Sequence, residues 1–232
     1  MIGSIFLWVC WPSFNAATAT PLDAKERAVL NTVLSLVGST MATFMLSQAI
    51  DRHRKFDMVT IANSTLAGGV AIGTIANVIL EPVYAILIGF IAGIVSVLGY
   101  KFLTPFLTER IGLHDTCGVH NLHGMPGLIA GIVSVIAVTY PEDDYGASIN
   151  NIYTGVRSTG SGGRGYSYGV QATHQLAAMF IILGASLLSG ALTGLLLRLK
   201  FWRQLDDEAQ YSDAEFFEIP DDFERVTATA RE

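Results

Sequence analysis

Long apolar segments dominate the chain, and short polar segments separate them. Six blocks of about 20 residues are apolar enough to cross a hydrocarbon core about 30 Å thick. They cover residues 1–18, 29–50, 58–80, 83–104, 117–139 and 174–198. None alternates in polarity as the strands of a closed barrel do, and none contains an obvious run of turn residues. Because backbone groups in lipid must be paired internally, we expect an all-α, polytopic membrane helix bundle over 1–198.

The composition supports a membrane protein. Hydrophobic residues make up 51% and charged residues 15% of the chain, whereas soluble domains carry about 25% charged residues. Much of the acidic charge lies in a tail, 199–232, outside any apolar block. No basic face is present, so we expect no nucleic-acid partner.

The basic residues indicate an orientation. If the six blocks alternate across the membrane, the more basic side has Arg52, Arg54, Lys55, Lys101, Arg110, Arg198, Lys200 and Arg203. The other side has Lys25, Arg27, Arg157 and Arg164. The positive-inside rule then predicts a cytoplasmic acidic tail and an outer glycine-rich loop at 141–171.

The first block is not typical of a cleaved signal peptide. It has no basic n-region, and its tryptophans are bulky for an h-region. It is apolar from its first residue, so an artificial start at Met1 is one interpretation and a natural start at Met1 is the other. Cys10 and Cys117 do not form a recognisable framework, and we expect reduced thiols.

The stretch CGVHNLHGMPG, residues 117–127, places two histidines beside a fully uncharged segment. If a helix starts near Asp115, His123 lies about 12 Å along it, near mid-membrane. Ionisable groups at such depth usually line a cavity or are paired, and neutral imidazole can relay protons. Pro126 cannot donate a backbone hydrogen bond, which frees the Leu122 carbonyl. We therefore predict that His123 lines a pore and that Pro126 supports its site.

The neighbouring polar residues have structural interpretations. His120 lies on the same helix face as His123, nearer to water, and we expect it to orient its neighbour. Asp115 fits an N-cap, with a local potential for cations as the alternative. A metal site that uses Cys117 is disfavoured, because one helix does not easily turn three such side chains onto a tetrahedral centre. We expect no metal and no cofactor.

A second cluster, WVCWPSFNAA at 8–17, combines a proline within a span with Trp11, Phe14 and Asn15. Aromatic faces can hold cations or close a narrow lumen. They are equally typical of an interfacial aromatic belt, and the residues alone leave both interpretations open. The P-loop, G-x-S-x-G and H-E-x-x-H motifs are absent, so we do not expect an enzyme.

The segments FLWVCWPSFNAA, HDTCGVHNLHGMPG, NSTLAGGVAIG and THQLAAMF together resemble the Rh (Rhesus) glycoprotein branch of the ammonium transporter family. The resemblance implies homotrimers, usually in the plasma membrane, with a histidine-lined apolar pore in each subunit. It implies that ammonium is recruited and that ammonia crosses, with methylamine and carbon dioxide as other candidate substrates. His123 matches a pore histidine and Phe14 a gate phenylalanine, while Trp11 and Val119 match pore-wall positions. Asp115 matches the acidic residue ahead of the histidine helix.

The chain departs from the family pattern in length. Family members have eleven or twelve spans in two inverted halves, and the six blocks here resemble the second half. We therefore expect a C-terminal half, or fragment, that does not form a complete pore alone. A non-transporting scaffold subunit is the alternative, and a metal-binding or redox membrane protein is a third class.

Overall fold

The computed structural model describes residues 1–140 and 152–202, and every regular element within them is a helix. The chain divides into two units, Met1–Ile181 and Ile182–Glu232, and the first carries the residues of interest. Most of the predicted acidic tail, 199–232, lies outside the described residues. The all-α prediction is confirmed.

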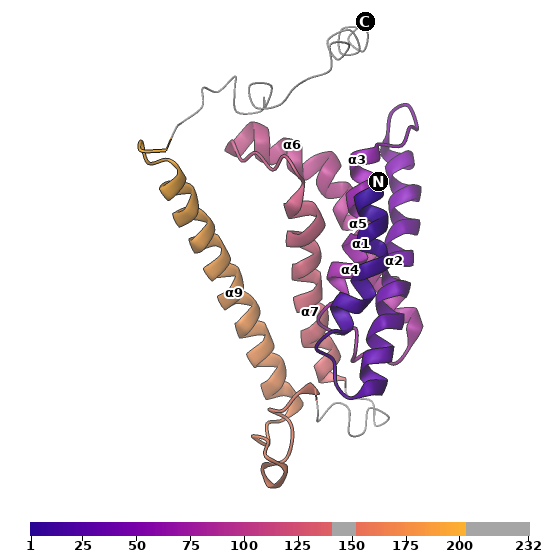
Figure 1. The fold of residues 1–232 in the computed structure, drawn as a ribbon, viewed down its shortest axis with the longest axis vertical. Coiled ribbons are helices and arrows are strands. Elements are labelled where there is room, and N and C mark those ends of the chain that lie inside the picture. The colour runs from indigo at the N-terminus through magenta and orange to yellow at the C-terminus, as the bar shows by residue number, and fades with distance from the viewer. Residues whose placement is uncertain (141–151, 203–232) are drawn as a thin grey trace, which may run out of the picture. The chain divides into compact units, whose positions relative to one another are not determined.

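Four helical runs are long and apolar enough to cross a membrane, and two apolar helices are shorter. Figure 1 shows α1, α2, α5 and α7 packed side by side in the first unit, and α6 running sideways at one end of them. The main helices are α1 (Ile2–Ala16), α2 (Leu22–Ile50), α3 (Met58–Ser64), α4 (Ala67–Ala71), α5 (Pro82–Leu98), α6 (Thr104–Phe106), α7 (Met125–Thr139) and α9 (Tyr168–Leu197). Thus α2 starts seven residues before the apolar block at 29–50, since 29 − 22 = 7.

The third apolar block differs from the expected continuous span. It contains the short helices α3 and α4, and turns follow α4 up to Val78. Non-helical backbone at membrane depth is tolerated only where protein or water pairs its polar groups. Hydropathy alone therefore predicted the location of this segment but not its form.

A polar ladder on α2 pairs the irregular backbone. Four α2 side chains spaced four residues apart share one helix face, as i, i+4 positions do. They donate to carbonyl oxygens of the third block: Arg27 to Asn77 at 2.8 Å, Asn31 to Ala76 and Ile79 at 2.8 Å each, Ser35 to Gly68 at 2.8 Å, and Ser39 to Ser64 at 2.6 Å. The ladder explains how 58–80 departs from a regular helix inside a bundle.

Glycines allow α2 and α5 to approach closely. A Cβ on Gly93 would lie 2.6 Å from the Ser39 carbonyl oxygen, and one on Gly89 would overlap the backbone of Ser35. Real side chains do not tolerate such distances, so each position requires glycine for this packing. Gly38 on α2 has the reciprocal role, because its Cβ would overlap the Ile86 carbonyl on α5.

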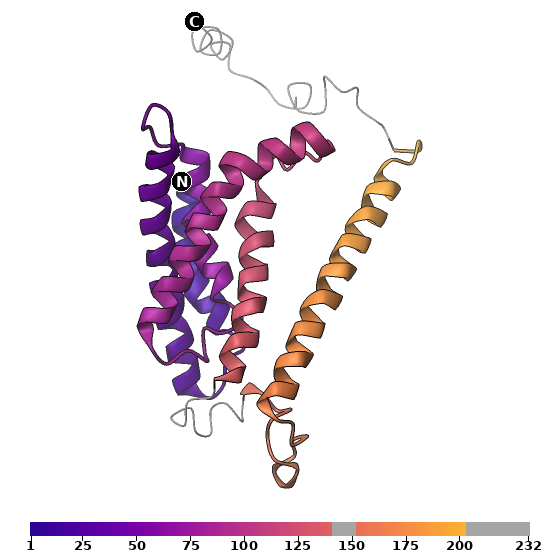
Figure 2. The same ribbon diagram turned by 180° about the vertical axis from the view of Figure 1, so that it is seen from behind.

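The helical run that begins with α5 bends before it ends. Two π-helices, η1 (Gly99–Leu103) and η2 (Leu107–Ile111), flank α6, which contains Pro105. Proline and π-helical turns are established causes of helix bending, and Figure 2 shows the bend. Gly112 then ends the run in a left-handed conformation with φ of 71°.

Candidate functional site

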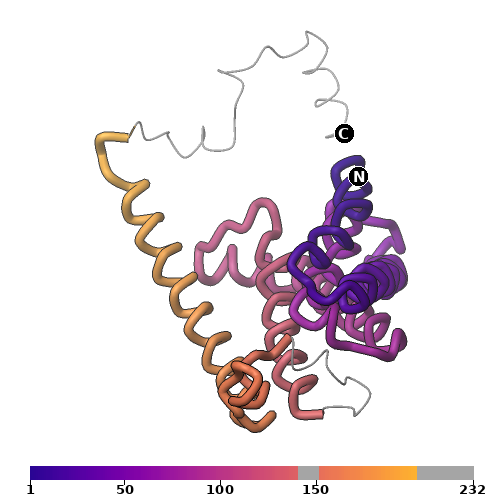
Figure 3. Tube along the Cα trace, turned by 60° about the horizontal axis from the view of Figure 1, so that its bottom comes forward, coloured from indigo at the N-terminus to yellow at the C-terminus, as the bar shows by residue number. Residues whose placement is uncertain are grey.

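Asn15 anchors α1 against two neighbouring elements. Its side-chain amide donates to the Thr32 hydroxyl of α2 at 3.1 Å and to the Gly69 carbonyl of α4 at 3.0 Å. Figure 3 shows α1 beside these elements. Because Asn15 lies one helical turn after Trp11, the anchor sets the position of the indole. The supporting role of Asn15 in a site stays a prediction, and what the structure gives is its two hydrogen bonds to α2 and α4.

Trp11 lies against a glycine of α4. A Cβ on Gly69 would be 2.8 Å from the indole nitrogen, so only glycine leaves room for the ring. On the other side, the indole stacks on the His123 imidazole, with ring centroids 6.1 Å apart and planes 19° from parallel. Two residues from different apolar blocks therefore meet as one aromatic pair.

The helix that carries His123 begins with a π-turn. The π-helix η3 spans His120–Gly124, and the Met125 N–H donates to the His120 carbonyl five residues earlier. Pro126 follows directly and is buried. A proline at this point removes one α-helical donor, and π-turns are frequent at functional sites. The local irregularity places His123 at the junction of η3 and α7.

Asp115 precedes η3 and caps its first turn. Its carboxylate oxygens accept from the backbone N–H groups of Val119 at 3.0 Å and His120 at 2.8 Å. These donors belong to the first turn, which has no intrahelical acceptors, and a carboxylate there is also favoured by the helix dipole. Asp115 thus acts on the helix terminus.

Two contacts that sequence reasoning missed also hold the His123 helix. The buried Asn121 side chain donates to the Thr104 hydroxyl at 2.6 Å. The Tyr100 hydroxyl donates to the Gly118 carbonyl at 3.1 Å. Gly118 has a φ of 68°, which favours glycine. Both contacts tie the start of η3 to the α5–α6 region.

The Trp11–His123 pair lies in a groove between α1, α4 and α7. The groove has a volume of about 840 Å³. It is lined by Leu7, Cys10, Trp11, Phe14, Asn15, Ala17, Thr18, Gly69, Val70, Gly73, Thr74, His123, Gly127 and Ala130. The lining contains no charged carboxylate or amine, so it offers an apolar path with a single imidazole.

The structure brings together four predicted site residues and leaves four outside the groove. His123, Trp11, Phe14 and Asn15 line it, and the Phe14 side chain is 76% exposed. The residues outside the lining are Val119, His120, Asp115 and Pro126. Val119 was predicted to line the pore, but it precedes η3 and is 54% exposed outside this groove. His120 instead packs along its own helix, where its Nδ1 would be 3.0 Å from a Cβ on Gly124.

The described residues contain no group of three histidine, cysteine or acidic side chains able to hold a metal ion. Cys10 and Cys117 are both exposed free thiols. Cys10 lines the groove, a role that sequence reasoning did not assign. Its position one residue before Trp11 was the only available signal.

Helices long enough to cross a membrane define a polytopic membrane protein, and the apolar groove with one imidazole lies among its helices. Residues 1–216 match the Ammonium Transporter Family. The chain belongs to the ammonium transporter family and is a membrane protein.

Relatives and a solved structure agree with this assignment. The chain is 43% identical over 231 residues to ammonium transporter Rh type C of Bos taurus, covering 95% of this chain and 47% of that protein. It is 44% identical to ammonium transporter Rh type B of Rattus norvegicus, covering 98% and 49%. The solved structure of Nitrosomonas europaea Rh50, described as a Rhesus-family channel, matches with a TM-score of 0.70 and 33% identity, covering 99% of this chain and 52% of that one. The chain spans about half the length of these relatives.

Proposed function

We propose that this chain forms part of the wall of an Rh-type channel that conducts ammonia, drawn from ammonium, along the groove of Trp11 and His123. The observation that carries the proposal is the stacked Trp11–His123 pair inside an apolar groove. Relatives named ammonium transporters support the choice of substrate.

An apolar groove with one imidazole favours a neutral substrate. A charged ammonium ion that loses its water pays a large desolvation penalty, whereas neutral ammonia pays far less. Neutral imidazole both accepts and donates hydrogen bonds, so His123 can pass ammonia along a path that offers few other partners. Stacking on Trp11 holds the imidazole plane in place for this exchange. Methylamine and carbon dioxide remain the other candidate substrates of this path.

The other site residues have proposed roles in the same path. Phe14 is an exposed aromatic gate at the groove, and Trp11 is a wall residue. Val119 remains a candidate for the mouth of the path, beyond the groove itself. Asp115, His120, Asn15 and Pro126 support it by fixing the backbone that presents the pair.

A closed conduit needs a wall on every side, and this chain spans about half the length of its relatives. We propose that further membrane helices of the assembled channel supply that wall and that the assembly is a homotrimer in the plasma membrane. The acidic tail then faces the cytoplasm and the loop between α7 and α9 faces outside, as the distribution of basic residues favours.

The test is ammonia permeability in vesicles that contain the assembled protein, measured from internal pH by stopped flow. We expect His123→Ala to reduce the protein-dependent permeability about tenfold, because hydrogen bonding worth ~1.4 kcal/mol is lost along the path. The matched control is His174→Ala, since His174 is exposed, stacks on Tyr166 and does not line the groove. Equal permeabilities of the two variants would refute the proposal.

A scaffold subunit is the second candidate, and the Trp11–His123 stack is also the observation that favours it, because ring stacking stabilises packing without transport. A scaffold predicts no protein-dependent permeability in the wild type and lower thermal stability in His123→Ala. Measuring both quantities on the same samples separates the two functions.

A further inference from the structure

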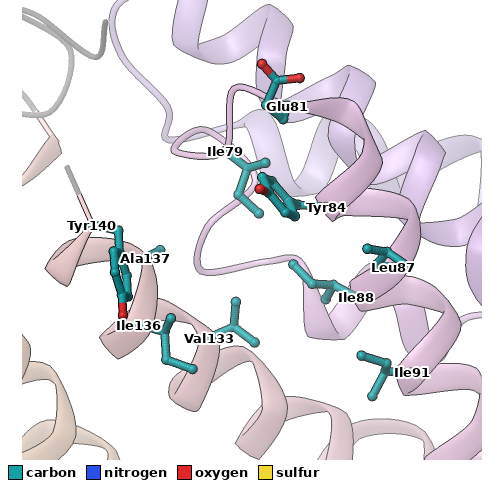
Figure 4. A pocket seen from close by; sticks show the side chains of 10 residues that line it. All are labelled: Ile79, Glu81, Tyr84, Leu87, Ile88, Ile91, Val133, Ile136, Ala137 and Tyr140. Atoms are coloured by element: carbon teal, nitrogen blue, oxygen red, sulfur yellow. The ribbon is translucent and has the colours of Figure 1, made fainter. Parts of the chain in front are cut away.

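A second groove lies between α5 and α7. It has a volume of about 450 Å³, within the range of small-molecule sites. Figure 4 shows its lining. The lining consists of Ile79, Glu81, Tyr84, Leu87, Ile88, Ile91, Val133, Ile136, Ala137 and Tyr140, none of which lines the groove of His123.

Two apolar stripes form the walls. The lining positions repeat at i, i+3, i+4 and i+7 on each helix, so each stripe occupies one helix face. They are Tyr84, Leu87, Ile88 and Ile91 on α5, and Val133, Ile136 and Ala137 on α7 with Tyr140 directly after its end. Each stripe extends about 10 Å at 1.5 Å per residue. The length matches part of one leaflet of a core about 30 Å thick.

The polar residues gather at one end of this groove. Tyr84 lies near the start of α5 and Tyr140 directly follows the end of α7, and the two rings face the groove from opposite sides in Figure 4. Their side chains are 53% and 74% exposed. Glu81 is at the same end, and among the residues that the structure describes none forms an ion pair with its carboxylate.

We propose that this groove binds phosphatidylcholine from the surrounding bilayer, with an acyl chain along the two stripes and the choline group at Tyr84, Tyr140 and Glu81. Leu87, Ile91 and Ile136 of the stripes are exposed on helical runs long and apolar enough to cross a membrane, and in a bilayer such positions face acyl chains. Aromatic faces attract quaternary ammonium groups, and a carboxylate adds charge attraction. The same carboxylate repels the head group of an anionic lipid, so the polar end selects for a terminal cation.

The test is native mass spectrometry of the delipidated protein in detergent, titrated separately with phosphatidylcholine, phosphatidylglycerol of the same chains, and cholesterol. We expect the wild type to bind phosphatidylcholine about fivefold more tightly than phosphatidylglycerol, as one cation–π or ionic contact provides. Glu81→Gln should bring the two affinities within about twofold of each other.

Two substitutions on α7 test the acyl-chain position. Ala137→Phe fills the groove, so a few methylenes of the acyl chain can no longer be buried there. Binding of phosphatidylcholine should therefore weaken about tenfold. Ile132→Phe is the matched control, because Ile132 is 49% exposed on the same helix but does not line the groove. If Ala137→Phe does not fold, the exposed Glu81→Gln variant still tests the head-group site.

Three outcomes would overturn the proposal. The first is equal wild-type affinity for phosphatidylcholine and phosphatidylglycerol, which is what an interfacial tyrosine pair without a head-group site predicts. The second is tighter binding of cholesterol than of phosphatidylcholine. The third is equal binding by the Ala137→Phe and Ile132→Phe variants.

Discussion

Replacing Asn31 with alanine removes the central rung of the α2 ladder. Asn31 is 1% exposed, and its amide donates to the carbonyls of Ala76 and Ile79, both at 2.8 Å. The substitution leaves two acceptors without their donor in a segment that has no regular helix to pair them. The substitution should therefore destabilise the turns that follow α4.

Two estimates bound the effect. An unpaired buried acceptor costs ~1–3 kcal/mol in soluble proteins, which gives ~2–6 kcal/mol for two carbonyls. Hydrogen bonds between membrane helices average only ~0.6 kcal/mol, which gives ~1 kcal/mol for two bonds. The average of ~0.6 kcal/mol comes from regular membrane helices, whose backbone groups stay paired within the helix when a side-chain hydrogen bond is lost. The carbonyls of Ala76 and Ile79 lie in the turns and directly after them, and have no such helical partners. We therefore expect a decrease of ~2 kcal/mol in the free energy of unfolding.

The assay is unfolding of the purified protein in mixed micelles with increasing dodecyl sulfate, followed by tryptophan fluorescence. Asn63→Ala is the matched control, because the Asn63 amide donates at 2.9 Å to Val59 of its own helix. We expect the control to lose less than ~0.5 kcal/mol, since that bond adds little to a turn that is already paired. Equal losses in Asn31→Ala and Asn63→Ala would refute the role of the ladder.

Two further predictions concern packing and helix capping. Gly89→Ala should lower the free energy of unfolding by ~1–3 kcal/mol, because its Cβ would lie 2.6 Å from the Ser35 carbonyl carbon. Gly184→Ala is the control: a Cβ there meets no atom within 4 Å, so the variant should gain up to ~1 kcal/mol of stability. Thermal unfolding that ranks the two variants in the opposite order contradicts this packing. Asp57→Ala should cost ~1 kcal/mol at neutral pH, because the Asp57 carboxylate caps α3 through two backbone N–H groups. Partial burial raises the pKa of Asp57, but hydrogen bonds from Thr60 and Val59 outweigh it and hold the pKa below its usual 3.8. A lowered folded pKa gives stability that is present above the unfolded pKa and is lost as the pH falls through the folded pKa. The melting-temperature difference between the wild type and Asp57→Ala should therefore shrink as the pH falls below the usual carboxyl pKa, and a difference independent of pH would argue against the cap.

Sequence reasoning located the helices because apolar blocks of membrane length are a strong signal. It did not find the break within 58–80, because average hydropathy does not show which carbonyls a neighbouring helix can pair. The signal was present in α2, where Arg27, Asn31, Ser35 and Ser39 repeat every four residues. A search for polar residues at helical spacing inside apolar blocks would have found it.

The candidate site was partly predictable. Depth in the helix and the nearby Pro126 singled out His123, and the resemblance to a family singled out Phe14 and Trp11. The stacked pair itself was not predictable, because its two rings come from positions 112 residues apart in the chain, since 123 − 11 = 112. They meet because α1 and η3 both pack against α4. Val119, which was matched by motif alone, precedes η3 and lies outside the groove lining, so its role at the mouth of the path stays a prediction.

Cys10 gives the most direct test that the groove is the path for ammonia. It is an exposed thiol that lines the groove beside Trp11, whereas Cys117 is an exposed thiol outside it. A bulky methanethiosulfonate reagent should block ammonia permeability of vesicles that contain the wild type or Cys117→Ser, and Cys10→Ser should protect against the block. Full permeability after complete labelling of Cys10 would contradict the account.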